Sequence, residues 1–289
     1  MNVANPPYYI GCPSWSENAW RQSLYPEDAR STDFLELYAQ VFNAVEGNTT
    51  FYARPSPSTV QRWADILPEH FRFTAKFPRD ISHGGDLRDH LVAIEDFVQL
   101  LAPLGQRVAP FWLQLSASFT PSRLGELAAF IDALDRPLAV EVRNLAFFEK
   151  GADEKHLNRL LLDRGVERIC LDSRPLFSCL STDPAVLHAQ SKKPKVPPRP
   201  AALTQFPQVR FIGRPEMDAN DSFVEQWAQK VAGWIEEGRT PYVFLHTPDN
   251  IRAPDLARRF HAQLMTLLPG LPALPVLDRG PQVEQLGLL

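Results

Sequence analysis

The stretch FNAVEGNTTFY, at residues 42–52, sets the prediction of the fold. An apolar run ends on a carboxylate, Glu46, and a polar and aromatic loop with Asn48 and Tyr52 follows it. A short apolar run bounded in this way predicts a buried strand. In parallel α/β proteins, functional side chains gather where such strands end.

The same unit recurs along the chain of 289 residues. Strands are predicted at 8–12, 41–46, 71–76, 111–115, 138–142, 168–172, 209–212 and 242–245. They start roughly 28 to 40 residues apart, the length of a strand, a loop and a helix. Amphipathic segments that predict helices lie between them, at 32–40, 58–67, 89–102, 121–133, 155–164, 221–237 and 253–268. Eight strand–helix units predict an α/β protein that is a single (β/α)8 TIM-type barrel over residues 1–268, followed by an irregular tail at 269–289.

The sixth unit is irregular. After Asp172 only a short helix at 184–190 is predicted, and the basic, proline-rich SKKPKVPPRP follows at 191–200. A proline run of this kind is extended and semi-rigid. It has two interpretations: a lid or anion-steering arm over the site, or an exposed connection.

The composition narrows the class of protein. The chain is 44% hydrophobic and 22% charged, which is typical of a globular domain with a large core. A net charge of −4 argues against a globally basic nucleic-acid binder. Three cysteines without a CxxC pair, no signal peptide and no long apolar run predict a cytoplasmic protein without a membrane span.

Alternation along the strands predicts which side chains enter the barrel. The outward face is expected to be apolar because helices cover it. In the sixth strand, for example, Ile169 and Leu171 are predicted to point outward, which turns Asp172 inward. The inward set near the carboxyl ends is Glu46, Lys76, Gln114, Glu141, Arg143, Asp172, Arg210 and His246.

Burying so many charges is costly unless they are paired or used. One interpretation is a polar pocket for a ligand, and the other is a structural lattice of ion pairs. Three carboxylates and three Lys or Arg side chains balance one another, so no metal site is predicted, and the cofactor is left open. The candidates for catalytic, acid–base roles are Glu46, Glu141, Lys76, Asp172 and His246. The candidates for substrate binding are Arg143, Arg210, Gln114, Asn48, Tyr52, His83, Trp15, Trp20 and Tyr25. Four of them, Trp15, Trp20, Tyr25 and Tyr52, are expected to form a stacking wall for a ligand.

Several blocks also resemble a known family. They include IGCPSWSENAWRQSLYP at 10–26, the run at 42–83 that begins FNAVEGNTTFYARPSP, FWLQLSASF at 111–119 and LAVEVRNLAFF at 138–148. These blocks resemble the DUF72 family of YecE-like proteins over roughly residues 8 to 265. The resemblance implies a TIM-type barrel and supplies no reaction. By this resemblance, the characteristic polar residues of the family correspond to Trp20, Tyr25, Glu46, Asn48, Tyr52, Lys76, His83, Gln114, Glu141, Arg143, Asp172 and Arg210.

The chain departs from the family pattern at three places. It reads Gly11-Cys12-Pro13-Ser14-Trp15 where Gly-Thr-Ser-Gly-Trp is usual. Ile212 stands where a histidine is common, and His246-Thr247 stands where paired asparagines are usual. One hypothesis is that His246 compensates for the missing histidine from the adjacent strand.

Three functional hypotheses follow. The first is an enzyme, a hydrolase or isomerase, that acts on a small anionic substrate such as a phosphate ester or a sugar derivative. The second is a nucleic-acid-binding or nuclease-like protein that uses the basic segment at 192–199. The third is a non-catalytic barrel that binds a ligand. The oligomeric state is left open.

Overall fold

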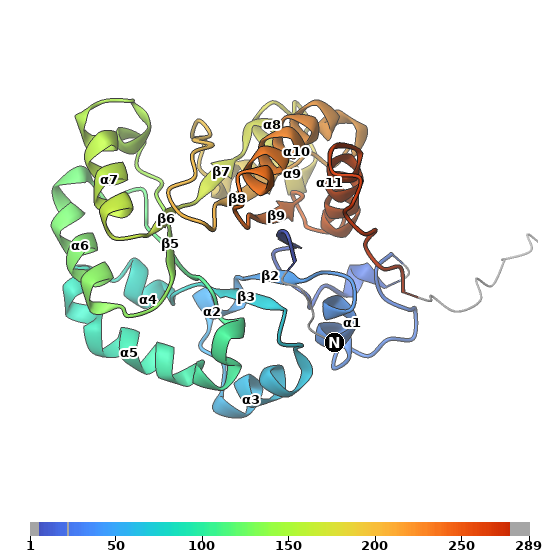
Figure 1. The fold of residues 1–289 in the computed structure, drawn as a ribbon, viewed down its shortest axis with the longest axis horizontal. Coiled ribbons are helices and arrows are strands. Elements are labelled where there is room, and N and C mark those ends of the chain that lie inside the picture. The colour runs from blue at the N-terminus through green and yellow to red at the C-terminus, as the bar shows by residue number, and fades with distance from the viewer. Residues whose placement is uncertain (1–5, 22, 278–289) are drawn as a thin grey trace, which may run out of the picture.

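Strands run through the middle of the molecule and helices surround them (Figure 1). The computed structural model describes residues 6–21 and 23–277. The strands are β1 (Tyr9–Gly11), β2 (Ala44–Gly47), β3 (Arg72–Ala75), β4 (Phe111–Gln114), β5 (Leu138–Glu141), β6 (Glu167–Arg168), β7 (Cys170–Asp172), β8 (Gln208–Ile212) and β9 (Tyr242–His246). Every predicted strand is present, and the sixth is divided into β6 and β7 at Ile169.

All strand pairs run parallel, which confirms an α/β fold with parallel sheets. Hydrogen bonds group the strands into three sheets with the orders β1-β9-β8-β7, β2-β3 and β4-β5-β6. An isolated bridge joins Lys76, after β3, to Trp112 in β4. The ladders therefore do not form one continuous ring.

The helices follow the strands as predicted. They are α1 (Phe34–Ala39), α2 (Thr49–Tyr52), α3 (Pro57–Ile66), α4 (Arg79–Ser82), α5 (Leu91–Leu100), α6 (Leu124–Ala133), α7 (Ala152–Asp163), α8 (Arg174–Phe177), α9 (Pro184–Lys192), α10 (Asp221–Glu236) and α11 (Ala253–Leu267). Short 3-10 turns lie at Asn18–Trp20, Leu87–His90, Ala102–Arg107, Pro121–Arg123, Leu145–Phe148 and Asp218–Asn220. The single-turn helices α2, α4 and α8 were not predicted, because four residues are too few to show a helical period.

Local sequence explains particular joins. Ser56 caps α3 by accepting a hydrogen bond from the Thr59 amide at 3.1 Å, and Pro57 occupies the first helical position, where no N–H is needed. Gly11 allows β1 to approach β2, since a Cβ atom there would lie 1.9 Å from the Ala44 carbonyl oxygen.

Two separate hydrophobic clusters show which side of the strands each residue faces. A large cluster lies between strands and helices. A smaller one lies among the strands and comprises Tyr9, Ala44, Trp112, Ala139, Ile169, Tyr242 and Phe244. Ala44, Trp112, Ala139 and Phe244 each lie two residues before a predicted inward residue (Glu46, Gln114, Glu141 and His246), as alternation requires, but Ile169 was predicted to point outward. The predicted register of the sixth strand is therefore wrong by one residue.

Asp172 shows why that register prediction failed. Its carboxylate accepts hydrogen bonds from Trp227 Nε1 of α10, at 2.7 Å, and from Arg174 Nη2, also at 2.7 Å. The residue thus faces the helix layer, where donors from Arg174 and Trp227 satisfy its charge. The assumption that outward positions are apolar does not hold for a carboxylate that is paired in this way.

The irregular sixth unit packs over the ends of β7 and β8. Leu171 and Ile212 form a cluster with Val186 and Ala189 of α9 and with Val196 of the proline-rich segment. Ser173 Oγ also donates a hydrogen bond to the Pro194 carbonyl at 2.9 Å. The segment is therefore fastened to the body of the protein, and residues 191–193 are held near the strand ends.

The predicted tail has no helix or strand in its described part, residues 269–277, and its remainder lies outside the described residues. Leu271 is buried against the outer core, and the Pro272 carbonyl oxygen lies 2.8 Å from His261 Nε2. Within the described ranges, no helix is long and apolar enough to cross a bilayer.

Candidate functional site

Glu46, at the carboxyl end of β2, is fully buried and contacts three basic side chains. Lys76 Nζ donates to its Oε1 at 2.6 Å, and Arg210 Nη2 lies 2.9 Å from the same oxygen. His246 Nε2 donates to Oε2 at 2.6 Å. These side chains come from β2, from the residue after β3, from the middle of β8 and from the end of β9, so parallel strands bring distant parts of the sequence to one point.

Glu141, at the end of β5, extends this network. Arg143 Nε donates to its Oε1 at 2.7 Å, and Arg210 Nη1 donates to its Oε2 at 3.2 Å. Arg210 therefore bridges Glu141 and Glu46. Because its guanidinium is held from both sides, it has a fixed orientation.

Lys76 has further partners. Its Nζ donates to Asn48 Oδ1 at 2.8 Å and to Gln114 Oε1 at 3.4 Å, and lies 4.3 Å from the centre of the Trp112 ring. The network of Glu46, Asn48, Lys76, Gln114, Glu141, Arg143, Arg210 and His246 brings together most of the residues predicted for the site.

The network shifts the pKa of its members. Burial raises the pKa of Glu46, but Arg210, Lys76 and His246 outweigh burial and hold it well below its usual value. The same competition, with Arg143 as the main cation, lowers the pKa of Glu141 to about 2. Burial and Arg210 lower the pKa of Lys76 to about 8. Burial lowers the pKa of His246 to about 3, although Glu46 opposes this shift. At neutral pH both carboxylates are ionised and His246 is neutral.

A cavity of about 660 Å³ lies beside this network. Its lining comprises Pro13, Ser14, Asn48, Thr49, Phe51, Tyr52, Arg79, His83, Gln114, Arg143, His188, Lys192, Lys193, Arg210, His246 and Asn250. Five of these residues are Lys or Arg and three are His. Among the described residues, no Asp or Glu lines the cavity. Glu46 and Glu141 lie behind the cations rather than on the cavity wall, so the cavity presents positive charge.

Two polar atoms on this wall have no partner in the described structure. The buried Oγ1 of Thr49 and Oδ1 of Asn250 make no hydrogen bond within residues 6–21 and 23–277. Asn250 also adopts a left-handed conformation, with φ of 64°, which is uncommon outside glycine. Buried polar groups normally have partners, so these two atoms are exceptions, and both are themselves closed to solvent.

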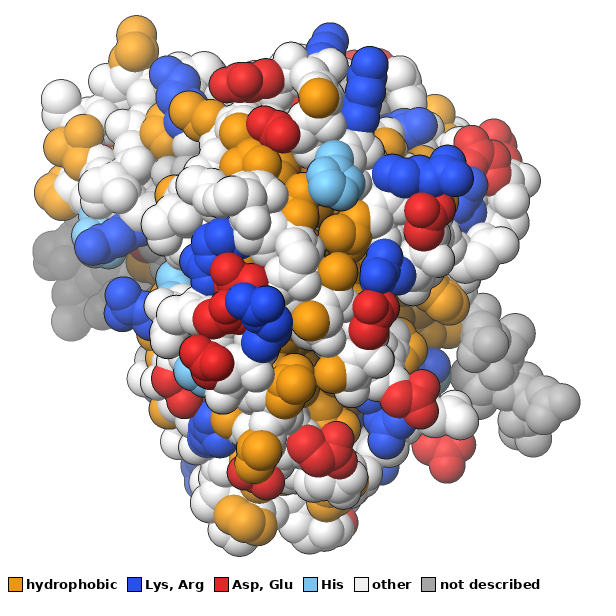
Figure 2. Space-filling view, turned by 90° about the vertical axis from the view of Figure 1, so that its left-hand side faces the viewer, with side chains coloured by type: hydrophobic (Ala, Val, Ile, Leu, Met, Phe, Trp, Pro, Cys, Tyr) orange, Lys and Arg blue, Asp and Glu red, His pale blue; other side chains and the backbone are white. Residues whose placement is uncertain are grey.

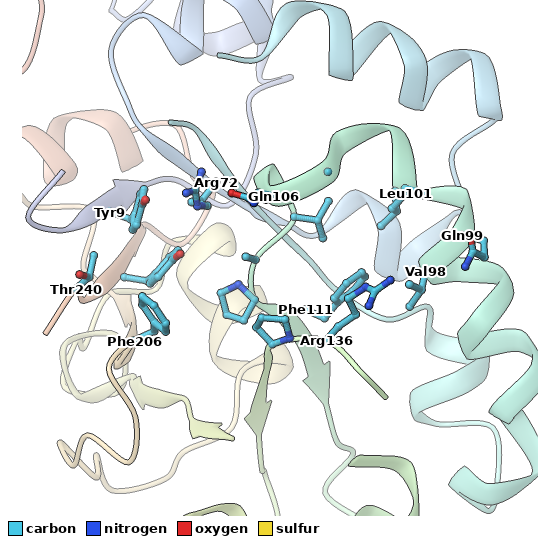
Figure 3. A pocket seen from close by; sticks show the side chains of 17 residues that line it. Tyr9, Arg72, Val98, Gln99, Leu101, Gln106, Phe111, Arg136, Phe206 and Thr240 are labelled. Atoms are coloured by element: carbon cyan, nitrogen blue, oxygen red, sulfur yellow. The ribbon is translucent and has the colours of Figure 1, made fainter. Parts of the chain in front are cut away.

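A second cavity, of about 590 Å³, differs in character (Figure 3). Tyr9, Arg72, Phe111 and Tyr242 lie where their strands begin, and Tyr9, Arg72 and Phe206 gather at one side of the cavity. Its wall is mostly apolar, and its described titratable groups are two arginines and two tyrosines. The Tyr9 and Tyr242 rings stack with centroids 4.5 Å apart. This cavity lacks the acid–base groups of the first, which is therefore the better candidate for a functional site.

Several predicted site residues lie elsewhere. Asp172 is outside the network because it faces α10. Trp15, Trp20 and Tyr25 are buried in the outer core and do not form the predicted stacking wall. Tyr25 OH donates to the Trp15 carbonyl at 2.6 Å, so these rings pack the loop after β1. Only Tyr52 of the four aromatic residues is exposed at the rim, at 80%.

Other lining residues were missed by the sequence analysis. Thr49, Arg79, His188, Lys193 and Asn250 come from short helices, α9 and the loop after β9. Strand alternation carries no information on such segments. The basic run at 191–200 was a signal for Lys193, because one interpretation placed it over the site. Arg199, in contrast, pairs with Glu154 away from the cavity.

His83 lies on the wall in the predicted set. Its Nδ1 is 2.9 Å from Ser82 Oγ, and burial, Arg143 and Arg79 lower its pKa below the usual value. A neutral imidazole is therefore available at the cavity at neutral pH. Among the described residues, no group of three His, Cys, Asp or Glu side chains is arranged to hold a metal ion.

Comparison with known proteins identifies the family of the chain. The model of the family described as "Protein of unknown function DUF72" matches residues 9–276. The chain is 42% identical over 273 residues to the UPF0759 protein YecE of Escherichia coli K12, covering 94% of this chain and 97% of that protein. The corresponding protein of Escherichia coli O157:H7 is 41% identical with the same coverage.

Solved structures show the same fold. A DUF72 family protein of Enterococcus faecalis V583 aligns with a TM-score of 0.68 at 20% identity, over 95% of this chain and 98% of that one. A DUF72 family protein of Thermotoga maritima aligns with a TM-score of 0.66 at 22% identity, over 89% of this chain and 98% of that one. The chain therefore belongs to the DUF72 family, with YecE among its relatives.

Proposed function

We propose that this protein is an enzyme that binds a small anionic substrate, a phosphate ester or a sugar-derived anion, in the cavity at the strand ends and transforms it by acid–base chemistry. The observation that carries the proposal is the lining of five Lys or Arg and three His side chains without a described carboxylate. The chain as a whole has a net charge of −4, so this concentration of positive charge is local. An anion that enters a buried cationic site gains charge-assisted hydrogen bonds.

We also propose that the strands form a closed (β/α)8 barrel, with residues 1–268 as one domain. The Glu46 amide donates to the Cys12 carbonyl at 3.1 Å, which links β2 to the chain after β1. The Lys76–Trp112 bridge links β3 to β4, and the Ile169 amide donates to the Val140 carbonyl at 2.9 Å. These contacts support closure across the breaks between the three sheets.

In this proposal the buried carboxylates position other groups. Glu46 and Glu141 are ionised and each is bound by cations, so they are poor proton donors at neutral pH. They fix Arg210 and Arg143, whose guanidinium groups bind the anion. His83, with its lowered pKa, is the proton acceptor in reach of the cavity.

A nucleic-acid ligand has less support. Tyr52 is the exposed aromatic side chain on the described cavity wall, whereas single-stranded nucleic acid is usually held by several stacking rings. Basic and acidic side chains are interspersed on the face shown in Figure 2, which offers no continuous track for a phosphate backbone. A small ligand suits a cavity of about 660 Å³ better.

A melting screen of the purified protein with phosphosugars, nucleotides, short oligonucleotides and sugar acids tests this proposal. Binding to the folded state raises the melting temperature by linkage. We expect a small phosphorylated ligand to raise it, and Arg143→Ala to weaken that ligand at least tenfold, because a charge-assisted contact contributes about 1.5–3 kcal/mol. Arg136→Ala, in the other cavity, is the matched control and should bind normally.

The results of the screen separate the possible functions. A shift with small phosphorylated ligands, followed by their conversion in NMR spectra, supports an enzyme. A shift without conversion of any binding ligand would leave only the ligand-binding function. The proposal fails if only oligonucleotides raise the melting temperature, or if Arg136→Ala weakens binding as much as Arg143→Ala does.

A further inference from the structure

Lys193 differs from Lys76 in two ways: its side chain lines the cationic cavity, and its amine has no partner among the described residues. The residue follows directly after α9 and is half-buried. Lys76 Nζ is held by Glu46 and Asn48, but Lys193 Nζ has no hydrogen bond or ion pair within the described ranges. Its amine is therefore free to react with a molecule in the cavity.

The surroundings of Lys193 favour the neutral amine. Burial has the largest effect, and Arg210, Lys76 and Arg143 add positive charge that outweighs the attraction of Glu46. Together they lower the pKa of Lys193 to about 7. About half of the amine is then unprotonated at neutral pH, whereas an ordinary lysine with a pKa of about 10.4 is almost entirely protonated. The unprotonated amine is the nucleophilic form.

We propose that Lys193 forms a covalent imine with the carbonyl carbon of an anionic aldehyde or ketone held in this cavity. This inference rests on the proposed function and narrows its substrate class to phosphorylated or otherwise anionic carbonyl compounds. Arg143 and Arg210 bind the anionic group, and Lys193, which lines the same cavity, reacts with the carbonyl.

The step is balanced with the groups present. The Nζ lone pair attacks the carbonyl carbon, and proton transfer from nitrogen to the alkoxide oxygen gives a carbinolamine. A second N–H proton is then lost, the C–O bond breaks and the oxygen leaves as water, so that a C=N bond replaces C=O. His83 can accept and return protons in this step, because its imidazole is neutral and lines the same cavity. The imine draws electrons from the neighbouring C–H bond, which isomerisation requires.

Pyridoxal 5′-phosphate is a suitable probe, since it carries an aldehyde and a phosphate. The full-length protein is incubated with it, reduced with sodium borohydride, and analysed by intact mass and peptide mapping. We expect one equivalent of label on Lys193 at pH 7, with a labelling rate that rises with a midpoint near pH 7. Pyridoxal without the phosphate should label at least tenfold more slowly, and inorganic phosphate should protect.

Matched variants identify the reactive amine. Lys193→Arg keeps the positive charge and should lose the saturable label. Lys195→Arg, in the same segment, should keep it, because Lys195 Nζ lies over the Phe177 ring and Lys195 is not on the cavity wall. The melting temperature of each variant shows that it is folded.

The inference is overturned if the saturable label lies on another lysine or if Lys193→Arg retains it. If pyridoxal 5′-phosphate raises the melting temperature and Arg143→Ala abolishes this, but no label forms on Lys193, the imine is wrong and the proposed anion site stands. If the compound neither binds nor labels, and no other small anion raises the melting temperature, both proposals fail.

Discussion

Glu46 is the residue on which the charged network depends. It accepts hydrogen bonds from Lys76, Arg210 and His246 while its own side chain is excluded from solvent. Removing one member of a buried ion pair leaves the others desolvated without compensation, which costs more than the pair itself contributes.

We predict that Glu46→Gln lowers the free energy of unfolding by about 3–5 kcal/mol, because Lys76 and Arg210 lose their shared anion. Chemical denaturation measures the loss. Glu149→Gln, at an exposed position, is the control and should change stability by less than about 0.5 kcal/mol. The double variant Glu46→Gln, Lys76→Met should regain part of the lost free energy of unfolding. A loss below about 1 kcal/mol in Glu46→Gln alone would show that the network is not coupled in this way.

His246 makes stability depend on pH. Its pKa of about 3 in the folded state is below the unfolded value of 6.5, so the unfolded chain binds more protons between these values. The contribution of His246 is therefore fully present above pH 6.5 and is lost as the pH falls. Glu46 and Glu141, whose pKa values are also lowered, lose their contributions only below about pH 4.5.

We predict that between pH 6.5 and 5 the free energy of unfolding of the wild type falls, and that His246→Asn reduces this slope by up to about 1.4 kcal/mol per pH unit. Urea denaturation at a series of pH values gives the slope. His156→Asn, at an exposed position of α7, should leave it unchanged. An identical slope in wild type and His246→Asn would contradict a neutral buried imidazole.

At the scale of elements, the sequence was informative about strands and poor at short connecting segments. Apolar runs spaced by one strand–helix unit predicted every strand and the longer helices. The polar ends of β2, β3, β5, β8 and β9 predicted the charged network, because parallel strands place their carboxyl ends together. Loop helices such as α2 and α4, and the position of α9, depend on tertiary packing that periodicity does not record.

β7 shows why one candidate residue was misplaced. Its three residues are all buried, but so are those of β2, β4 and β5, whose inward positions were predicted correctly, so burial alone does not explain the error. The side chain of Asp172 then depends on a partner far away in the sequence, Trp227 of α10. No local pattern predicts that pairing.

We predict that Trp227→Phe destabilises the protein by about 1–3 kcal/mol more than Trp234→Phe on the same helix. Both changes remove an indole, but only the first leaves the buried Asp172 carboxylate without the Nε1 donor. Thermal and chemical denaturation report the difference, and affinity for the small anion should stay the same in both variants. Weakened anion binding in Trp227→Phe alone would place Asp172 in the site after all.

At the scale of the whole molecule, the two cavities divide the chemistry between them. The cavity beside the ion-pair network holds the Lys, Arg and His side chains, and the other is walled mainly by apolar groups and rings. A protein with a net charge of −4 repels anions at long range, so binding must come from contacts inside the cationic cavity. These contacts are less screened by salt than exposed charges are.

Soaking crystals in tungstate, an anion that resembles phosphate and scatters anomalously, shows directly whether the cavity holds an anion. We predict an anomalous peak within hydrogen-bond distance of the guanidinium groups of Arg143 and Arg210, in the cavity that Lys193 lines. In Arg143→Ala crystals the occupancy of that peak should fall, while Arg136→Ala crystals should keep it. A cavity without tungstate, at concentrations that produce peaks elsewhere on the molecule, would contradict the account of an anion site.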